Sequence, residues 1–130
     1  MNNILGVGID LVSIDRMERI LERTPHFFER VFQRTEKEKI KTSTSPASTA
    51  AGIFAVKEAS AKALGCGLSR LGYDGVCVHY EENGRPFLTW SENKIREAGY
   101  ILHKSHVSIS HDGGLATAIV ILEGVHVSSE

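Results

Sequence analysis

The sequence lacks the features that would send a chain into a membrane or out of the cell. Its opening segment, MNNILGVGIDLV, contains no basic residue and carries Asp10 inside the apolar run, whereas a secretory signal begins with a basic segment followed by an unbroken apolar one. No apolar run approaches the roughly 18 residues that a membrane-spanning helix needs. We therefore expect an unprocessed, soluble protein without a membrane span.

Cysteine is scarce, and neither sign of charge dominates. The two cysteines, Cys66 and Cys77, match neither a zinc pattern nor a redox C-x-x-C motif, and their spacing indicates no disulfide framework. Fifteen basic and sixteen acidic residues leave a formal net charge of -1, so no overall field favours nucleic acid or an acidic membrane. We expect a cytoplasmic protein with no nucleic-acid partner, which meets charged ligands through local clusters.

Short apolar runs bounded by turn residues predict a single α+β domain over residues 1–130. A chain of this length buries about two-thirds of its unfolded surface without disulfides or metals. The Asn83-Gly84 pair lies between two such runs and predicts a tight hairpin. Residues 124–130 are expected to form a loose tail. Strands are predicted at 4–12, 76–81, 85–90, 106–110 and 115–122.

Capping residues and chain breakers predict the helices. Thr35 and Glu38 have the spacing of a capping box for a short helix. Ser45-Pro46 suits the start of a long helix, and Gly65 suits its end. The first helix is expected to stop at the Thr-Pro pair that follows it. Helices are predicted over 14–23, 34–40, 46–64 and 91–102.

Within the predicted long helix, the segment FAVKEASAKAL places three charges among small apolar residues. We expect the small side of this helix to be buried and the charged side to face a partner. The alternative is a solvated face, on which an i,i+4 pair of glutamate and lysine is worth only about 0.2–0.5 kcal/mol. At 100° per residue, one arc of about 140° holds Phe54, Lys57, Glu58, Ala61 and Lys62.

The first predicted strand carries two glycines beside an aspartate. Gly6, Gly8 and Asp10 alternate onto one face of this strand. Because glycine weakens a strand, this pattern indicates close approach by another backbone or by a ligand. An aspartate at a strand end is also an ordinary helix-entry residue, which is the alternative. The opposite face of the strand holds Val7, Ile9 and Leu11.

Near the C-terminus, the segment SISHDGG contains serine, histidine and aspartate in consecutive positions. The members of a catalytic triad meet through space and are not consecutive in the chain. We therefore do not predict a nucleophilic serine here. A histidine in a turn is the simpler interpretation of His111.

Together, GIDLV, FAVKEASAKAL and SISHDGGLATA resemble, in order and separation, the holo-acyl-carrier-protein synthase family, the small 4'-phosphopantetheinyl transferases of fatty acid biosynthesis. The resemblance covers nearly the whole chain, including the turn Gly84-Arg85-Pro86. It implies a compact domain in which a long central helix packs on an antiparallel sheet. The chain departs from the family pattern at Ile53, where a basic residue is usual, so the resemblance does not extend to the coenzyme A or partner contact expected at that position.

The resemblance implies transfer of 4'-phosphopantetheine from coenzyme A to a serine hydroxyl of apo-acyl carrier protein, with release of adenosine 3',5'-bisphosphate. By similarity, Asp10 and Glu58 bind magnesium, or manganese in its place, because these ions take carboxylate and phosphate oxygens. Lys62 would then contact the phosphates as a point charge. The family also implies a homotrimer with sites between subunits.

By the same similarity, Glu58, Lys62 and His111 form the catalytic set. His111 is assigned to phosphate contact or to proton transfer, and a metal-bound or ordered water is the alternative base. For Lys57, the alternative to a substrate contact is a structural role. The positions that match the substrate site are Lys57, Lys62, Gly65, Gly67, Pro86, Ser110 and His111.

Three arginines of the first predicted helix form a basic stripe. Arg16, Arg19 and Arg23 fall within about 60° of one another around the helix axis. On a chain that is nearly neutral, such a stripe predicts a local docking surface. Because acyl carrier proteins are acidic, the resemblance assigns the stripe to carrier-protein docking. Pairing within the helix, such as Asp15 with Arg19, is the alternative use.

Two other functions would use some of these residues. A noncatalytic module that binds coenzyme A or a carrier protein would keep the basic stripe but would not need both carboxylates. A magnesium-dependent nucleotide or pyrophosphate hydrolase would use both carboxylates, with water as the nucleophile.

Overall fold

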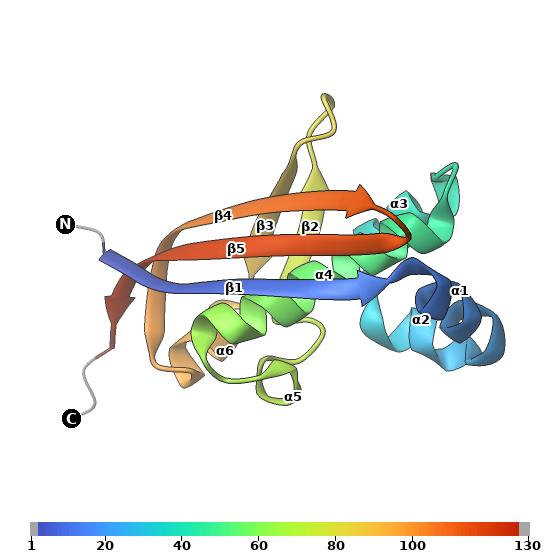
Figure 1. The fold of residues 1–130 in the computed structure, drawn as a ribbon. Helices are drawn as coiled ribbons and strands as arrows, with labels where there is room; N and C mark the ends of the chain where they lie inside the picture. Colours follow the sequence, from blue (N-terminus) through green and yellow to red (C-terminus); the bar gives the residue numbers. More distant parts are fainter. Residues whose placement is uncertain (1–2, 128–130) are drawn as a thin grey trace.

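A long helix lying across one face of an antiparallel sheet is the centre of the fold (Figure 1). The structure is a computed structural model that describes residues 3–127. The helix is α4 (Pro46–Leu64). Its sheet has the strand order β1 (Asn3–Ser13), β5 (Leu115–His126), β4 (Tyr100–Asp112), and all neighbours are antiparallel. The predicted α+β class and the packing of the long helix on an antiparallel sheet are confirmed.

Shorter elements surround the long helix. A second, two-stranded antiparallel sheet is formed by β2 (Val76–Tyr80) and β3 (Pro86–Trp90), which the predicted Asn83-Gly84 turn connects. The first two helices follow β1 directly and lie at one end of α4 (Figure 1). The remaining elements are α1 (Ile14–Arg23), α2 (Pro25–Val31), α3 (Arg34–Thr42), α5 (Leu68–Leu71) and α6 (Glu92–Glu97).

Glycines in β1 allow α4 to lie close to the sheet. A Cβ atom added at Gly6 would overlap the carbonyl oxygen of Ala63, and one added at Gly8 would overlap that of Ala59. Since backbone atoms cannot give way as a flexible side chain can, any larger residue at either position would push the helix outward. The predicted close approach is confirmed, and the approaching group is the backbone of α4.

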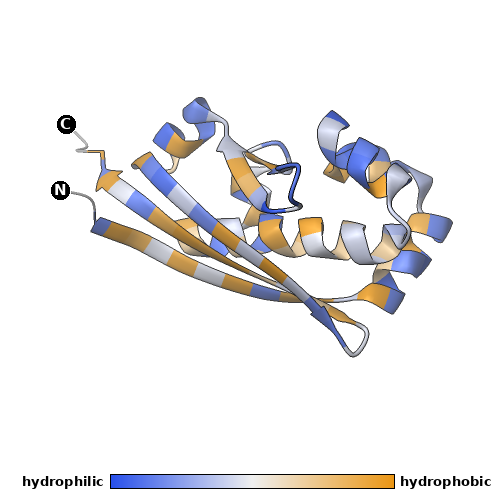
Figure 2. Ribbon diagram, turned by 90° about the horizontal axis from the view of Figure 1, so that it is seen from above, coloured by the Kyte–Doolittle hydropathy of each residue, from blue (hydrophilic) through white to orange (hydrophobic). Residues whose placement is uncertain are grey.

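The two faces of the three-stranded sheet differ sharply in burial. The inner face of β5 places Ala118, Val120 and other small or branched residues against α4. Figure 2 shows that α4 covers one side of the sheet and that, in the described part of the chain, no helix covers the other. We call this second side the outer sheet face. Its exposed apolar residues are Ile4, Val7, Ile9, Leu11, Leu115 and Ile119.

The cap of one helix differs from the predicted one, and one predicted stop also begins a further helix. The α3 capping box uses Gln33 and Glu36, not Thr35 and Glu38, because the Glu36 carboxylate accepts a hydrogen bond of 2.8 Å from the Gln33 backbone N–H. The predicted stop at Thr24-Pro25 is confirmed, because α1 ends at Arg23, and Pro25 also starts α2, where its missing N–H costs no hydrogen bond.

The C-terminal third contains more strand than expected. The helix predicted over 91–102 ends at Glu97, and Gly99 turns the chain with a φ of 95°. Pairing with β5 then extends β4 over 100–112, because long-range strand pairing outweighs local helix propensity. A loose tail is predicted over 124–130, but residues 124–126 belong to β5, in which His126 pairs with Tyr100. Residues 128–130 lie outside the described residues.

No helix in the described part of the chain is both long enough and apolar enough to cross a membrane.

Candidate active site

Packing of α4 on β1 brings Lys62 to Asp10. Asp10 lies on the same face of β1 as Gly8, toward α4. The Lys62 Nζ donates to Asp10 Oδ1 at 3.1 Å and to the carbonyl oxygen of Ile9 at 3.0 Å. The contact partner of this lysine is therefore Asp10, 52 residues away in the chain, and not the i,i+4 neighbour Glu58.

Glu58 completes a group of three charges on β1 and α4. Burial raises the pKa of the Glu58 carboxyl, and the charge of Asp10 raises it further, whereas Lys62 lowers it. The two carboxylates are thus close enough to repel each other. An additional positive charge between them would be stabilised by both.

The donor set of these carboxylates fits magnesium or manganese. Both ions prefer oxygen ligands, and magnesium is often held by one or two carboxylates, with phosphates and waters completing its shell. Among residues 3–127, no group of three or more His, Cys, Asp or Glu side chains could hold a metal ion. An ion at Asp10 and Glu58 would therefore need further oxygens from water or from a phosphate-bearing substrate.

The accessible stripe of α4 is narrower than the predicted charged arc. Phe54, Glu58 and Lys62, spaced four residues apart, are partly or largely exposed, whereas Lys57 and Ala61 are buried. A pocket of about 230 Å³ adjoins this stripe, between β1, α1, α2 and α4. Its lining includes both carboxylates, Arg16 and the aromatic residues Phe27 and Phe54. The carboxylates thus open toward a partly apolar space beside α1.

The predicted basic stripe lies next to this pocket. Arg16, Arg19 and Arg23 line a shallow groove of about 250 Å³ on α1. Arg16 also lines the carboxylate pocket, so the two features are continuous. Arg19 makes the predicted local pair with Asp15, at 3.5 Å and in an exposed position. Such a pair is weak, and it leaves the other two arginines for a partner.

The structure does not bring His111 to the carboxylates within one chain. His111 lies on β4, and its Nε2 donates to the carbonyl oxygen of Ser48 at 3.0 Å, in the first turn of α4. Glu58 is ten residues further along the same helix, a rise of about 15 Å. Ser110 alternates onto the outer sheet face, away from α4. These two residues therefore stand apart from Asp10, Glu58 and Lys62.

The remaining predicted positions are on turns. Gly65 ends α4 with a φ of 68°, and Gly67 precedes α5 with a φ of 74°, conformations that glycine adopts without strain. Pro86 begins β3 in the second sheet, opposite Tyr80. Ile53, the departure from the family pattern, is fully buried in the core.

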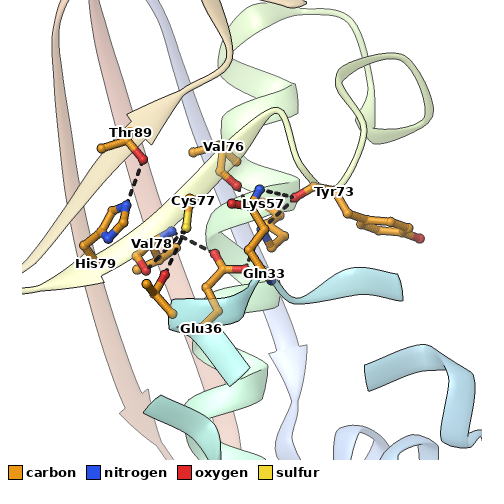
Figure 3. A network of polar contacts seen from close by, with 10 residues as sticks. Gln33, Glu36, Lys57, Tyr73, Val76, Cys77, Val78, His79 and Thr89 are labelled. Carbon is orange, nitrogen blue, oxygen red and sulfur yellow. Dashed lines mark hydrogen bonds and ion pairs between the residues drawn. The ribbon is translucent and has the colours of Figure 1, made fainter. Parts of the chain in front are cut away.

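Lys57 is buried and does not face the candidate site. Its side chain is 0% exposed, and its Nζ donates to a Glu36 carboxylate oxygen at 2.9 Å and to the carbonyl oxygens of Tyr73 and Val76 at 2.8 and 2.9 Å (Figure 3). The expected substrate contact is wrong, and the structural alternative accounts for this residue. Sequence patterns gave no signal for Glu36, whose burial depends on α3 packing against α4 and β2.

Comparison with known proteins identifies the family of the chain. Residues 6–120 match the family described as the 4'-phosphopantetheinyl transferase superfamily. The chain belongs to this superfamily.

Within the superfamily, the chain is similar to holo-[acyl-carrier-protein] synthases. That of Sulfurovum sp. (strain NBC37-1) is 35% identical over 120 residues, which cover 92% of this chain and 97% of that protein. The crystal structure of Helicobacter pylori holo-[acyl-carrier-protein] synthase in complex with coenzyme A matches with a TM-score of 0.78 and 33% identity, over 89% of this chain and 98% of that one. The Bacillus anthracis synthase in complex with CoA (3',5'-ADP) matches with a TM-score of 0.78 and 32% identity, over 94% and 98%.

Proposed function

We propose that the chain is a holo-[acyl-carrier-protein] synthase, which transfers 4'-phosphopantetheine from coenzyme A to a serine hydroxyl of apo-acyl carrier protein. One observation carries the proposal: Asp10 of β1 and Glu58 of α4 line the same pocket and lie close enough to repel each other, in a chain similar over nearly all its length to enzymes of this name. Two solved relatives are complexes with coenzyme A or its nucleotide part.

In the proposed reaction, the serine oxygen bonds to the phosphorus on the pantetheine side of the pyrophosphate. The bond from that phosphorus to the bridging oxygen breaks, and adenosine 3',5'-bisphosphate leaves. The serine proton passes to a base, for which His111 and an ordered water are the candidates. Negative charge on the pyrophosphate must be neutralised for this displacement to proceed.

Asp10 and Glu58 would hold magnesium or manganese. The bound ion would neutralise charge on the pyrophosphate oxygens. Lys62, whose ammonium already lies beside Asp10, is suited to contact a phosphate held at the same carboxylates. A fixed positive charge at that position favours the leaving oxygen as its charge develops.

We propose that the site is completed by a second copy of the chain in a homotrimer. Within one chain His111 and Ser110 stand apart from the carboxylates, so the family's catalytic and substrate positions cannot all serve one substrate there. The outer sheet face supports assembly, because Val7, Ile9 and Leu11 are 55%, 60% and 61% exposed. Contiguous exposed apolar surface of this kind is typical of protein interfaces.

We assign carrier-protein docking to α1. Arg16 and Arg23 are exposed and line the same groove on α1, and Arg16 also lines the carboxylate pocket. Neither carries an ion pair within the described part of the chain. A basic surface of this kind attracts an acidic partner and guides its serine toward Asp10 and Glu58. Both cysteines are free, which fits action in a reducing cytoplasm. The role that we propose there is in fatty acid biosynthesis.

One experiment separates this function from its two alternatives. The protein is incubated with apo-acyl carrier protein, coenzyme A and magnesium, and the carrier is weighed by mass spectrometry. We expect the carrier to gain one phosphopantetheinyl group and the medium to gain adenosine 3',5'-bisphosphate. Binding without a mass change would indicate a noncatalytic module, and cleavage of coenzyme A with an unmodified carrier would indicate a hydrolase.

A further inference from the structure

Lys62 crosses from α4 to β1 and places its ammonium on Asp10. The two hydrogen bonds, to Asp10 Oδ1 at 3.1 Å and to the Ile9 carbonyl oxygen at 3.0 Å, hold the lysine head at the strand. The Asp10 side chain is only 18% exposed, whereas that of Lys62 is 55% exposed. The carboxylate is therefore largely enclosed, while the lysine stem is free to move toward solvent.

The charges around Asp10 explain why the Lys62 side chain extends from α4 to β1. Asp10 and Glu58 carry two negative charges close together, and the Lys62 ammonium supplies one positive charge beside them. Without this lysine, the two partly buried carboxylates would lie close together and Asp10 would lose its neutralising charge. Lys62 thus supplies Asp10 with a neutralising positive charge, as a divalent cation bound there would.

We propose that Lys62 is an internal counter-ion that occupies Asp10 while the site has no ligand and leaves it for the phosphate of the incoming substrate. The inference rests on the proposed function, because it takes Asp10 and Glu58 as the ligands of the cation. A lysine suits this exchange, since its compact charge is carried on a flexible four-carbon stem. In both states the Lys62 ammonium pairs with an anion, the Asp10 carboxylate in one state and a substrate phosphate in the other.

The exchange makes cation binding and substrate binding depend on each other. In the free protein, the cation has to compete with the Lys62 ammonium for Asp10. When a pyrophosphate draws Lys62 away, the Asp10 carboxylate is released. By linkage, each ligand then strengthens binding of the other, and the free protein binds the cation weakly.

The first measurement is the affinity of the substrate-free protein for Mn²⁺ alone, followed by electron paramagnetic resonance. Removing the competing ammonium with Lys62→Met should tighten Mn²⁺ binding on the order of fivefold, the scale of a partly exposed ion pair. Lys62→Gln serves as a second variant and should behave alike. The matched control is Lys94→Met, which removes the same charge and also breaks a pair with an aspartate, Asp74; it should leave Mn²⁺ affinity unchanged.

The second measurement separates displacement of Lys62 from a general change of charge. Wild-type protein is acylated briefly with an amine-reactive reagent, with and without saturating Mn²⁺, and labelled lysines are counted by mass spectrometry. We expect labelling of Lys62 to rise with Mn²⁺, because its ammonium is no longer paired, and that of Lys94 to stay constant. Equal Mn²⁺ affinity in wild type and Lys62→Met, or unchanged Lys62 labelling, would overturn the inference.

Failure of the inference can be told from failure of the proposed function. A wild-type protein that modifies the carrier protein but shows no Lys62 effect keeps its function and loses the internal counter-ion. Mn²⁺ binding that is undiminished in Asp10→Asn would remove Asp10 from the cation site, and the inference would fall with it. The transfer assay on the carrier protein decides the function independently of both.

Discussion

At the scale of single residues, Glu58 reports the electrostatics of the site. Its carboxyl pKa is raised, first by burial and then by Asp10, and is lowered by Lys62. A carboxyl with a raised pKa stays protonated to a higher pH than an ordinary glutamate, whose pKa is about 4.3. Its contribution to folding stability is therefore lost as pH rises through the folded pKa. A cation competes with this proton, so acid should weaken cation binding.

We predict opposite shifts of the Glu58 pKa in two variants. Asp10→Asn removes a negative neighbour and should lower it, whereas Lys62→Met removes a positive neighbour and should raise it. Titration of the Glu58 carboxyl carbon by ¹³C NMR measures both. Shifts of the same sign in the two variants would contradict the arrangement of the three charges.

Lys62 should matter far more for catalysis than for stability. Loss of one preorganised donor at developing charge should lower kcat on the order of 10²–10³-fold in Lys62→Met. The partly exposed ion pair with Asp10 should contribute no more than about 1 kcal/mol to the free energy of unfolding. Carrier-modification kinetics and urea denaturation measure the two effects. Near-normal kcat would remove Lys62 from the catalytic set.

At the scale of elements, a buried ion pair ties α3, α4 and β2 together. Glu36 and Lys57 are both 0% exposed. The Lys57 ammonium uses all three donors, and the Glu36 carboxylate also accepts the Gln33 and Val78 N–H groups, each at 2.8 Å (Figure 3). Burial lowers the pKa of Lys57, and Glu36 partly offsets this. Removing one partner leaves the other charged and buried.

We therefore expect strong coupling between these two residues. Lys57→Met should cost about 3–5 kcal/mol of unfolding free energy. Adding Glu36→Gln should recover part of that loss, because the uncompensated charge is gone. Urea denaturation of the two single variants and the double variant gives the coupling energy. Lys94→Met, at an exposed pair, should cost less than about 1 kcal/mol, and strictly additive losses in the cycle would refute the coupling.

The first helix supports a prediction about the carrier protein. Reversing charge at Arg16 and Arg23 should raise the KM for carrier protein and leave the KM for coenzyme A nearly unchanged. Rising salt should weaken the wild-type interaction, because exposed charges are screened over about 8 Å at physiological ionic strength. Arg96→Glu on α6, also exposed, is the control. An unchanged KM for the carrier would mean that docking uses another surface.

At the scale of the whole molecule, the outer sheet face predicts assembly. In a monomer, Val7→Lys would place a charge at an already exposed position and should change stability by no more than about 0.5 kcal/mol. In an assembly on this face it would bury an unpaired charge, so it should reduce the molar mass in light scattering and lower specific activity. Phe87→Lys, at an exposed apolar residue of the second sheet, should do neither. A fully active wild-type monomer would contradict the proposal.

Local patterns determined much of this protein. The alternation of Gly6, Gly8 and Asp10 predicted one face and a close neighbour, and both are present. The long helix, the hairpin and the α+β class also follow from residue periodicity and turn chemistry, which act over a few residues. The motifs that match the family lie in these same segments, so membership could be recognised from them.

Tertiary packing alone decided which faces meet. Lys57 and Lys62 share an arc of α4, yet Lys57 is buried against Glu36 and Lys62 reaches Asp10. Periodicity specifies the side of a helix but not the element packed against that side. In the same way, β4 extends to Tyr100 only because β5 offers a paired strand. Contacts between residues distant in the chain depend on packing of the whole core, and no local pattern contains them.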